Sequence, residues 1–173
     1  MPDSIRPRAE RPKVPAGYGM PDGDDGMLPW EWVDEQLTRA ANYWFATVWP
    51  DGGAHASPVW GVWLDGALFF DGSPETRRMK NIAANPEVAV HLESGDEVVI
   101  LEGPATAMPA PPPRELTERL SAAYTAKYTG HGYAPAPDQW DTGGLYVVTP
   151  RACLAWTFRE GEEFGKTYTR FVF

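Results

Sequence analysis

The segment Gly72–Pro86 reads GSPETRRMKNIAANP and predicts a short helix between two strands. Ser73 belongs to the residue types that cap a helix N-terminus, and Pro74 suits the first helical position. The dipeptide Asn85-Pro86 is a stop signal, because the residue before a proline is pushed out of the helical conformation. We therefore expect a helix that starts at Ser73 and ends before Pro86.

The first turn of this expected helix is basic. Arg77, Arg78 and Lys80 outnumber Glu75, although the partial positive charge of a helix N-terminus normally favours Asp or Glu there. The pattern is explained if an anion binds at this end, and a phosphate held by backbone N–H groups and arginine side chains is the most common such anion. The alternative is a solvated basic turn that happens to lie near a cap.

Length and composition indicate one folded domain. The chain has 173 residues, of which 43% are hydrophobic and 13% aromatic, with eight tryptophans. This content argues for a core and against disorder. The formal net charge is −9, from 15 Lys and Arg against 24 Asp and Glu. Because nucleic-acid binding depends on neutralising phosphates, and anionic lipid repels an acidic chain, we expect neither a nucleic acid nor a membrane as a partner.

Cysteine and histidine patterns give little support for other chemistry. Cys153 is the one cysteine of the chain, so no disulfide is expected, and such a residue in an apolar strand is usually a packing residue. His55, His91 and His131 lie in separate segments without metal-ligand spacing, so we expect no metal site. His55 either lines a ligand pocket or is an ordinary strand residue.

The chain divides into a tail and a domain. Residues 1–27 contain five prolines and four glycines without periodicity, and predict either a disordered tail or an extended arm laid over the domain. Residues 28–173 form the expected domain, beginning with an amphipathic helix at about 29–41 that covers one end of a sheet. No segment has the apolar character of a signal or membrane-spanning sequence, so a cytoplasmic location is expected.

From Asn42 onward the hydrophobic period changes to two, which predicts strands joined by tight turns. The dipeptide Asp65-Gly66 is a strong hairpin signal, and Pro58 within a strand fits an edge, a bulge or a place where a ligand replaces ladder partners. Antiparallel hairpins with few helices favour a small closed or partly closed barrel, so the expected class is mainly β with flanking helices. The expected strands are 43–49, 54–64, 67–71, 88–92, 98–108, 145–149, 153–158 and 167–173, with a helix after Pro111-Pro112-Pro113.

Three motifs in a fixed order carry a resemblance to a known family. They read ATVWPDGGAHASPVWGVWLDGALFF, then GSPETRRMKNIAANPEVAVHLE, then VVILEGPA, between Trp44 and about Ala107. This order resembles the FMN-binding split-barrel superfamily, the pyridoxamine 5′-phosphate oxidase-like proteins. It is most similar to their branch of flavin and deazaflavin oxidoreductases, which includes coenzyme F420-dependent members. The resemblance implies an antiparallel split β-barrel and a homodimer with two sites at the subunit interface.

The resemblance also implies cofactor-binding residues in two motifs. The family's SPVW-type strand lies against the cofactor ring, and its Ser/Thr-Arg-Lys-x-x-Asn-Leu motif holds the phosphate. Here Arg78 stands in place of the usual Lys, which keeps the charge and changes its geometry. The cofactor-binding residues expected on these grounds are Ser57, Pro58, Val59, Trp60, Ser73, Thr76, Arg77, Arg78, Lys80 and Asn81.

The function implied by the resemblance is a flavin- or deazaflavin-dependent oxidoreductase that transfers a hydride to or from a small organic substrate. The cofactor is FMN or F420, and the branch similarity favours F420. The C-terminal segment ACLAWTFREGEEFGKTYTRFVF lacks the Arg-Leu-x-Pro-like motif that holds pyridoxal phosphate, so a genuine pyridoxamine phosphate oxidase is not expected. No catalytic side chain is assigned, because the cofactor carries the hydride chemistry. The alternative is a non-catalytic protein that stores or carries a flavin or haem on the same fold.

A run of apolar residues predicts where two subunits meet. Val59, Trp60, Val62, Trp63 and Leu64 follow one another almost without interruption, whereas a barrel wall has only one interior face. The helix at 29–41 is expected to cover part of the second face, and a partner subunit the rest. We therefore expect a homodimer with Trp60 or Trp63 at or near its interface.

Overall fold

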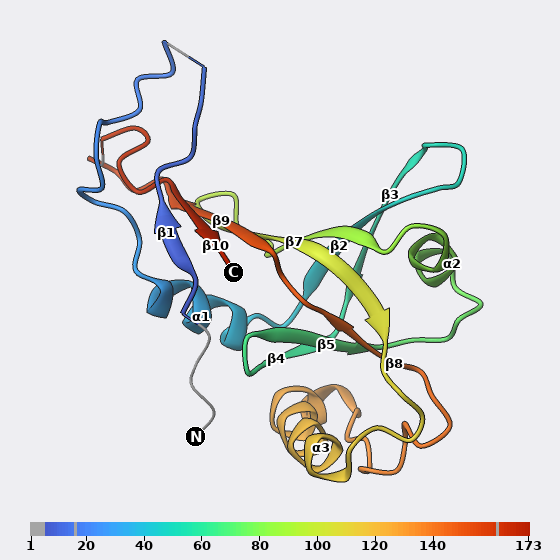
Figure 1. Cartoon of the computed structure of the whole chain (residues 1–173). Helices are drawn as coiled ribbons and strands as arrows, with labels where there is room; N and C mark the ends of the chain where they lie inside the picture. The colour runs from blue at the N-terminus through green and yellow to red at the C-terminus, as the bar shows by residue number, and fades with distance from the viewer. Residues whose placement is uncertain (1–5, 16, 162) are drawn as a thin grey trace.

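Antiparallel strands are the main regular elements of the chain in a computed structural model that describes residues 6–15, 17–161 and 163–173 (Figure 1). The strands alternate between buried and exposed residues, as in β2, where Tyr43, Phe45 and Thr47 are buried. The strands are β1 (Arg8–Glu10), β2 (Tyr43–Val48), β3 (Ala54–Val59), β4 (Gly61–Leu64), β5 (Ala67–Asp71), β6 (Glu87–His91), β7 (Glu97–Ala107), β8 (Leu145–Val148), β9 (Ala152–Thr157) and β10 (Thr169–Val172). The helices are α1 (Trp30–Arg39), α2 (Arg77–Ala84), α3 (Arg114–Tyr128) and the 3-10 turn η1 (Thr129–His131).

The strands form two layers that share β7. The larger layer has the order β1-β10-β9-β7-β6-β2-β3, and the smaller layer pairs β4 with β5, β5 with β8 and β8 with the end of β7. All these pairs are antiparallel. The antiparallel split-barrel fold expected from the sequence is therefore confirmed. Pro58 lies in β3, an edge strand, where its missing N–H removes no central ladder bond.

The strand expected over 54–64 is two strands that belong to different layers. β3 pairs with β2, whereas β4 pairs with β5, and the chain changes layer at Trp60 and Gly61. Tyr128 of α3 replaces ladder partners at this point, because its hydroxyl accepts a hydrogen bond from the Gly61 N–H at 3.0 Å. A Cβ atom on Gly61 would lie 2.9 Å from the Phe69 carbonyl oxygen, so the crossing requires glycine. The hairpin at Asp65-Gly66 is confirmed, with both residues at positive φ.

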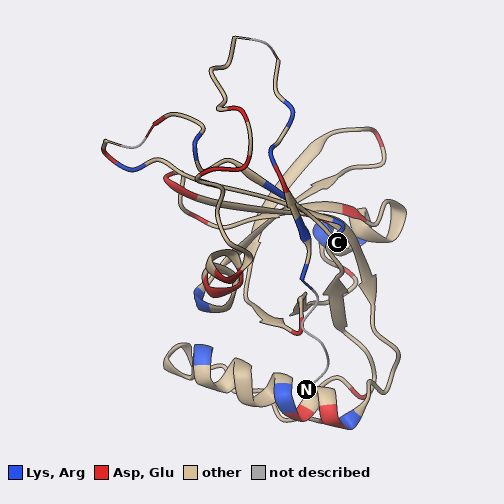
Figure 2. Cartoon of the chain, turned by 60° about the vertical axis from the view of Figure 1, so that its left-hand side comes forward, with Lys and Arg blue, Asp and Glu red and all other residues tan. Residues whose placement is uncertain are grey.

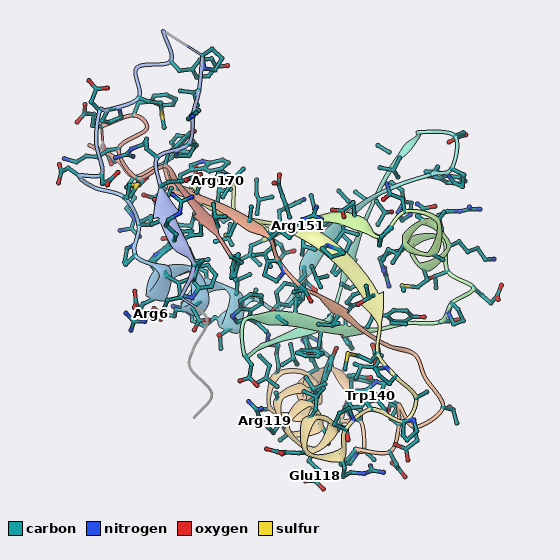
Figure 3. The ribbon with its side chains drawn as sticks, in the orientation of Figure 1. Arg6, Glu118, Arg119, Trp140, Arg151 and Arg170 are labelled. Carbon is teal, nitrogen blue, oxygen red and sulfur yellow. The ribbon has the colours of Figure 1, made fainter. Side chains whose placement is uncertain are left out.

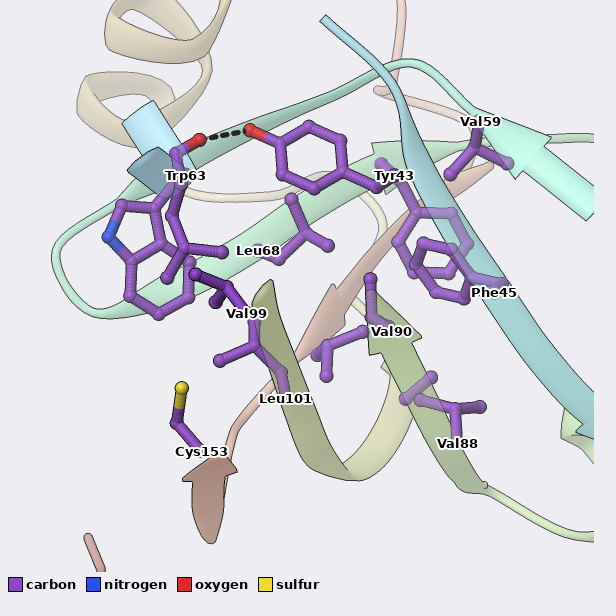
Figure 4. Close-up of a cluster of buried hydrophobic side chains, with 14 of the residues drawn as sticks. Tyr43, Phe45, Val59, Trp63, Leu68, Val88, Val90, Val99, Leu101 and Cys153 are labelled. Carbon is purple, nitrogen blue, oxygen red and sulfur yellow. Dashed lines mark hydrogen bonds between the residues drawn. The ribbon is translucent and has the colours of Figure 1, made fainter. Parts of the chain in front are cut away.

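The main core lies between the layers (Figure 4). Phe45 of β2 packs on Phe70 of β5 with ring centroids 4.6 Å apart, and Leu101 of β7 is fully buried beside them. Cys153 is buried in the same cluster, and burial raises the pKa of its thiol. Its expected role as a packing residue is confirmed.

Both faces of β4 are covered from within the chain. On one face Trp63 donates its indole N–H to the Asp34 carboxylate of α1 at 2.8 Å. On the other, Val62 belongs to a second core with Leu120 and Tyr124 of α3. Trp63 is 5% exposed and is covered by α1, as expected for part of the run at 59–64. Trp60 is 37% exposed, and a homodimer interface at or near Trp60 or Trp63 stays a prediction. The sequence correctly predicted that both faces of this run are apolar and must be covered. It did not show that α3 packs on one of them.

The part of the tail that the structure describes runs along the sheet edge. β1 pairs with β10, with Arg8 opposite Val172 and Glu10 opposite Arg170. Arg11, also in the tail, donates from its Nη1 to the backbone carbonyls of Gly165, Lys166 and Tyr168, at 3.1, 2.7 and 3.0 Å. These contacts join the first strand and the segment before β10. Residues 1–5 and 16 of the expected tail lie outside the described residues.

Candidate functional site

The helix α2 begins three residues later than the sequence indicates. The Ser73 carbonyl accepts a hydrogen bond from the Thr76 N–H at 3.1 Å, and its hydroxyl accepts one from the Glu75 N–H at 3.2 Å. These bonds form a separate turn, after which Thr76 is extended and occupies the cap position. The prediction of Ser73 as the cap and Pro74 as the first helical residue was therefore wrong. A side chain that caps a helix can equally close a turn just before it.

The later start places the basic residues closer to the helix end. Arg77 and Arg78 are the first two residues of α2, and its first turn contains no acidic residue. Basic residues are concentrated at this end of α2, whereas acidic and basic residues both occur along α3 (Figure 2). The N-terminal N–H groups of α2 and two guanidinium groups therefore lie together in a chain of net charge −9.

Arg78 connects the two motifs that the sequence assigned to the cofactor. Its Nη1 donates to the Ser57 hydroxyl of β3 at 3.1 Å. Gly72 lies beside it, and a Cβ atom there would be in ordinary contact with Nη2, at 3.5 Å. The side chain is half-buried, and its Nε is buried with no acceptor in the described part of the chain. Burial lowers the pKa of Arg78, while the Asp71 carboxylate opposes this shift. A partly desolvated cation with an unused donor is suited to bind an anion.

The other two cations of the expected phosphate motif, Arg77 and Lys80, have different partners. The guanidinium of Arg77 lies over the Trp49 ring, 3.9 Å from its centroid. Lys80 is exposed and forms an ion pair with Glu75 at 3.0 Å. Both cations are at the surface beside Arg78, and an incoming anion would compete with Glu75 for Lys80.

Asn81 lies on the buried face of α2 and is fully buried. Its Nδ2 donates to the Thr47 hydroxyl of β2 at 3.0 Å, and Thr47 Oγ1 lies 3.3 Å from Nδ1 of His55. The Asn81 Oδ1 is buried and has no donor in the described residues. This geometry gives Asn81 a positioning role, since it holds α2 against the strand pair β2–β3.

The four residues of the SPVW strand do not share one environment. Ser57 faces Arg78, Val59 is buried in the core, and Pro58 is exposed on the opposite face of the sheet. Trp60 is 37% exposed and stacks on Tyr128 with centroids 5.0 Å apart. Within this motif, Ser57 supplies the side-chain hydrogen bond to Arg78 of the basic turn.

Three further residues of the site, Asp71, Tyr133 and Gln139, were not predicted from the sequence. The Tyr133 hydroxyl donates to the Asp71 carboxylate, and Gln139 Nε2 donates to the Tyr133 hydroxyl at 2.8 Å. Tyr133 also contacts Trp60, with ring centroids 5.9 Å apart. Burial raises the pKa of Tyr133, and its hydrogen bond to Asp71 adds to this shift. The position of Asp71 directly before Gly72 is the one local signal that could have included it.

A metal-binding cluster and a membrane-spanning helix are both absent from the described residues. They contain no group of three or more His, Cys, Asp or Glu side chains arranged to hold a metal ion. None of the helices within them is long and apolar enough to cross a bilayer.

The antiparallel strand order defines a split-barrel protein. A family model described as pyridoxamine 5′-phosphate oxidase matches residues 30–157, which is most of the chain, and the chain therefore belongs to this family. The resemblance seen in the sequence motifs is confirmed by this match. No curated protein matches the sequence significantly.

Solved structures share the fold. A conserved hypothetical protein of Mycobacterium tuberculosis superposes with a TM-score of 0.65 at 22% identity, covering 80% of this chain and 89% of that one. A protein named F420 reductase gives a TM-score of 0.54 at 26% identity, with coverages of 69% and 94%. A heme-binding protein of Mycobacterium smegmatis gives 0.53 at 17% identity, with coverages of 71% and 52%. The first and third are similar in fold alone.

Proposed function

We propose that this protein is a flavin- or deazaflavin-dependent oxidoreductase that transfers a hydride to or from a small organic substrate. The observation that carries the proposal is the Arg78 side chain, which contacts Ser57 at 3.1 Å and keeps a buried Nε without an acceptor. A carboxylate close enough to form an ion pair with Arg78 is absent from the described residues. A cofactor phosphate supplies the charge and the acceptor that this arginine lacks.

The chain's own residues bind and orient the cofactor in this proposal. Arg78 and the first N–H groups of α2 hold the phosphate, and Arg77 and Lys80 add surface charge. Ser57 fixes the Arg78 side chain, and Asn81 fixes α2 on the strands. The bound cofactor supplies the hydride chemistry, so the protein needs to contribute binding, orientation and exclusion of water. The Trp60 and Tyr133 rings, beside the end of the SPVW strand, offer an aromatic surface for the substrate.

F420 is the cofactor we favour over FMN. The protein named F420 reductase is 26% identical to this chain and is covered over 94% of its own length. The three sequence motifs are also most similar to the branch that includes F420-dependent members. Both cofactors contain a phosphate, so the Arg78 argument applies to either of them.

Titration of the purified protein with FMN and with F420 tests the proposal. We expect saturable binding of at least one, and the absence of binding by both would overturn it. The absorption spectrum distinguishes the two, because a flavin shows two main visible bands and the deazaflavin one. Reduced cofactor is then offered to quinones, enones and tetrapyrroles. Stoichiometric binding without turnover on any acceptor would identify a carrier in place of an enzyme.

We also propose that the protein is a homodimer that pairs through the outer face of the larger sheet. The registers place Leu154, Ile100, His91, Trp44 and Pro58 in one row across five strands. This row lies on the side opposite the core, and neighbouring positions such as Val48 are exposed, in that case by 40%. A broad apolar face of this kind marks an interaction surface. The proposed interface therefore lies on this face and not at Trp63, which α1 covers.

The substitution Ala46→Glu tests the interface. Ala46 is exposed on the outer face between Ala56 and Ala89, so a charge there disrupts a dimer without entering the core. Light scattering at low micromolar concentration is expected to show a dimer for the natural chain and a monomer for the variant. Ala126→Glu, at an exposed position of α3, is the control and should remain dimeric. A natural chain that is monomeric would contradict the proposal.

A further inference from the structure

The Asp71 carboxylate is next to the basic turn of α2 but does not pair with its half-buried arginine. Asp71 is the last residue of β5 and directly precedes Gly72. A Cβ atom on Gly72 would lie 3.5 Å from Arg78 Nη2. Arg78 nevertheless donates to Ser57, Asp71 accepts from Tyr133, and no ion pair joins Asp71 to Arg78. Arginine and carboxylate groups form strong charge-assisted hydrogen bonds where they meet, so the separation of this pair has a structural cause.

Two side chains of the loop after α3 hold the Asp71 carboxylate. The Tyr133 hydroxyl donates to Asp71 Oδ2, and Gln139 Nε2 donates to the same oxygen at 3.4 Å. Gln139 Nε2 also donates to the Tyr133 hydroxyl oxygen at 2.8 Å, which leaves the tyrosine proton for the carboxylate. We call Tyr133 and Gln139 the Asp71 clamp. Because their bonds support one another, the carboxylate cannot turn toward Arg78 without losing the whole network.

The clamp holds Asp71 on the face of β5 that lies away from Arg78. Side chains alternate along a strand, so Asp71 shares a face with Phe69, which belongs to the second core under α3. Phe70 faces the main core, where it packs on Phe45. The Arg78 guanidinium lies on that side, 6.0 Å from the Phe45 ring centroid. Burial lowers the pKa of Arg78 and the Asp71 charge opposes this shift, so the two groups interact without contact.

The loop that carries the clamp is fixed to the rest of the fold. Trp140, next to Gln139, is fully buried in the second core beside α3 (Figure 3). The Ser121 hydroxyl of α3 donates to the Pro135 carbonyl at 2.7 Å. The Gly72 N–H donates to the Gly144 carbonyl at 3.1 Å, which joins the end of the loop to the end of β5. The clamp is therefore in place before any ligand binds, and no ordering of the loop is needed at that step.

We propose that Tyr133 and Gln139 are positioning residues that hold the Asp71 carboxylate away from Arg78 and so keep Arg78 free for the anionic group of the cofactor. This inference rests on the proposed function, because it takes that anion to bind at Arg78. Gly72 has no side chain to separate the two groups, so the hydrogen bonds of the clamp separate them. Without the clamp, Asp71 pairs with Arg78 and competes with the incoming anion.

The ¹H–¹⁵N spectrum of the arginine side chains tests the clamp in the full chain without any ligand. The Arg78 Nε–H peak is assigned by its loss in Arg78→Lys. In Tyr133→Phe, which keeps the ring, we expect this peak to shift because Asp71 pairs with the guanidinium. In the double variant Tyr133→Phe with Asp71→Asn, the peak should lie where it lies in Asp71→Asn alone. An unshifted peak in Tyr133→Phe, or a shift that persists in the double variant, would overturn the inference.

Cofactor affinity gives a second measurement on the same four proteins. Tyr133→Phe should weaken binding of FMN or F420 by about two- to fivefold, since the anion must displace a partly exposed ion pair. Asp71→Asn alone should not weaken it, and the double variant should bind as Asp71→Asn does. An equal loss in the Asp71→Asn background would mean that the Tyr133 hydroxyl contacts the ligand itself, and would contradict the clamp. Absence of binding by both cofactors in the natural chain would overturn the proposed function alone, because the arginine spectrum needs no ligand.

Tyr124→Phe is the matched control. The Tyr124 ring lies 5.7 Å from that of Tyr133 between centroids, but its hydroxyl donates to the Phe69 carbonyl at 3.2 Å. The variant therefore removes a neighbouring hydroxyl without removing a bond to Asp71. We expect a lower free energy of unfolding, with the Arg78 peak and the cofactor affinity unchanged. Equal effects of Tyr124→Phe and Tyr133→Phe on the Arg78 peak would mean that any hydroxyl lost from this core disturbs the site, and would contradict the clamp.

Discussion

The helices α2 and α3 both pack against the barrel, yet they differ in how their buried polar groups are satisfied. In α3 the Tyr124 hydroxyl donates to the Phe69 carbonyl at 3.2 Å, and the Lys127 ammonium donates to the Ala40 carbonyl at 2.8 Å. In α2 the Nε of Arg78 and the Oδ1 of Asn81 are buried without partners in the described part of the chain.

This difference separates a structural element from a candidate binding element. Buried polar groups without partners cost free energy, so they persist where another molecule supplies the partner. The 15-residue α3 covers β4 and closes the second core. Substitutions in α3 should therefore change the free energy of unfolding. The eight-residue α2 holds one unpaired donor, Arg78 Nε, one unpaired acceptor, Asn81 Oδ1, and positive charge at one end. Substitutions in α2 should therefore change binding.

The largest effect is expected for Leu120→Ala in α3. Leu120 is fully buried in the second core with Tyr124 and Trp140, so the variant loses transfer free energy and leaves a cavity. We expect the free energy of unfolding to fall by about 2–5 kcal/mol, with unchanged cofactor affinity per folded molecule. Denaturant unfolding followed by tryptophan fluorescence measures the first quantity. Leu116→Ala, half-buried on the same helix, should cost less, and a strong loss of affinity in Leu120→Ala would contradict the division of roles.

The second effect is expected for Arg78→Ala in α2. Cofactor affinity should weaken by about 1.5–3 kcal/mol, the range for a hydrogen bond to a charged group. Folding should change little, because removing a cation from the first turn relieves its repulsion with the helix dipole. Arg78→Lys keeps the charge and should recover part of the affinity. The assignment of the site would be wrong if Arg78→Ala unfolded the protein while its folded fraction bound cofactor normally.

The pH dependence of stability at Lys127 is a further test of the structural role of α3. Burial lowers the pKa of Lys127 to about 8 from its usual value near 10.5. Between these two values the unfolded chain binds more protons than the folded chain, so stability relative to Lys127→Met should rise as pH increases through this window. Allowing for solvent screening of a half-buried group, we expect a rise of about 1–2 kcal/mol. Unfolding of both proteins at several pH values measures it, and a constant difference would contradict the shift.

The smallest effect is expected for Arg119→Ala, which matches Arg78→Ala in chemistry but lies on α3. Arg119 forms an exposed ion pair with Asp65 at 2.7 Å, and exposed pairs contribute little. Stability should change within measurement error and cofactor affinity should stay the same. A loss of affinity comparable with that of Arg78→Ala would mean that any lost cation weakens binding, and that the position of Arg78 has no special role.

Local sequence signals predicted the parts of the fold that depend on neighbouring residues. Alternating hydrophobicity located the strands, and Asp65-Gly66 located a hairpin. The basic turn was recognised because a helix end and its charges are close in sequence. The boundary of α2 was missed because Ser73 has two local hydrogen-bonding choices, and its turn with Glu75 and Thr76 is the one formed.

Residues far apart in the sequence decided the rest. The Tyr128 hydroxyl accepts a hydrogen bond from Gly61, 67 positions away, where the expected strand is interrupted. Arg78 donates to Ser57, which is 21 positions away. Asp71, Tyr133 and Gln139 come together only when the loop after α3 returns to β5.

The sequence by itself thus determined most of the strands, the turns and the charge of α2, because these depend on residue types within a short stretch. The tertiary structure alone decided which faces were covered and which donors remained unpaired. These features depend on contacts between distant segments, and the path of the chain that creates such contacts is not encoded in any short stretch of it.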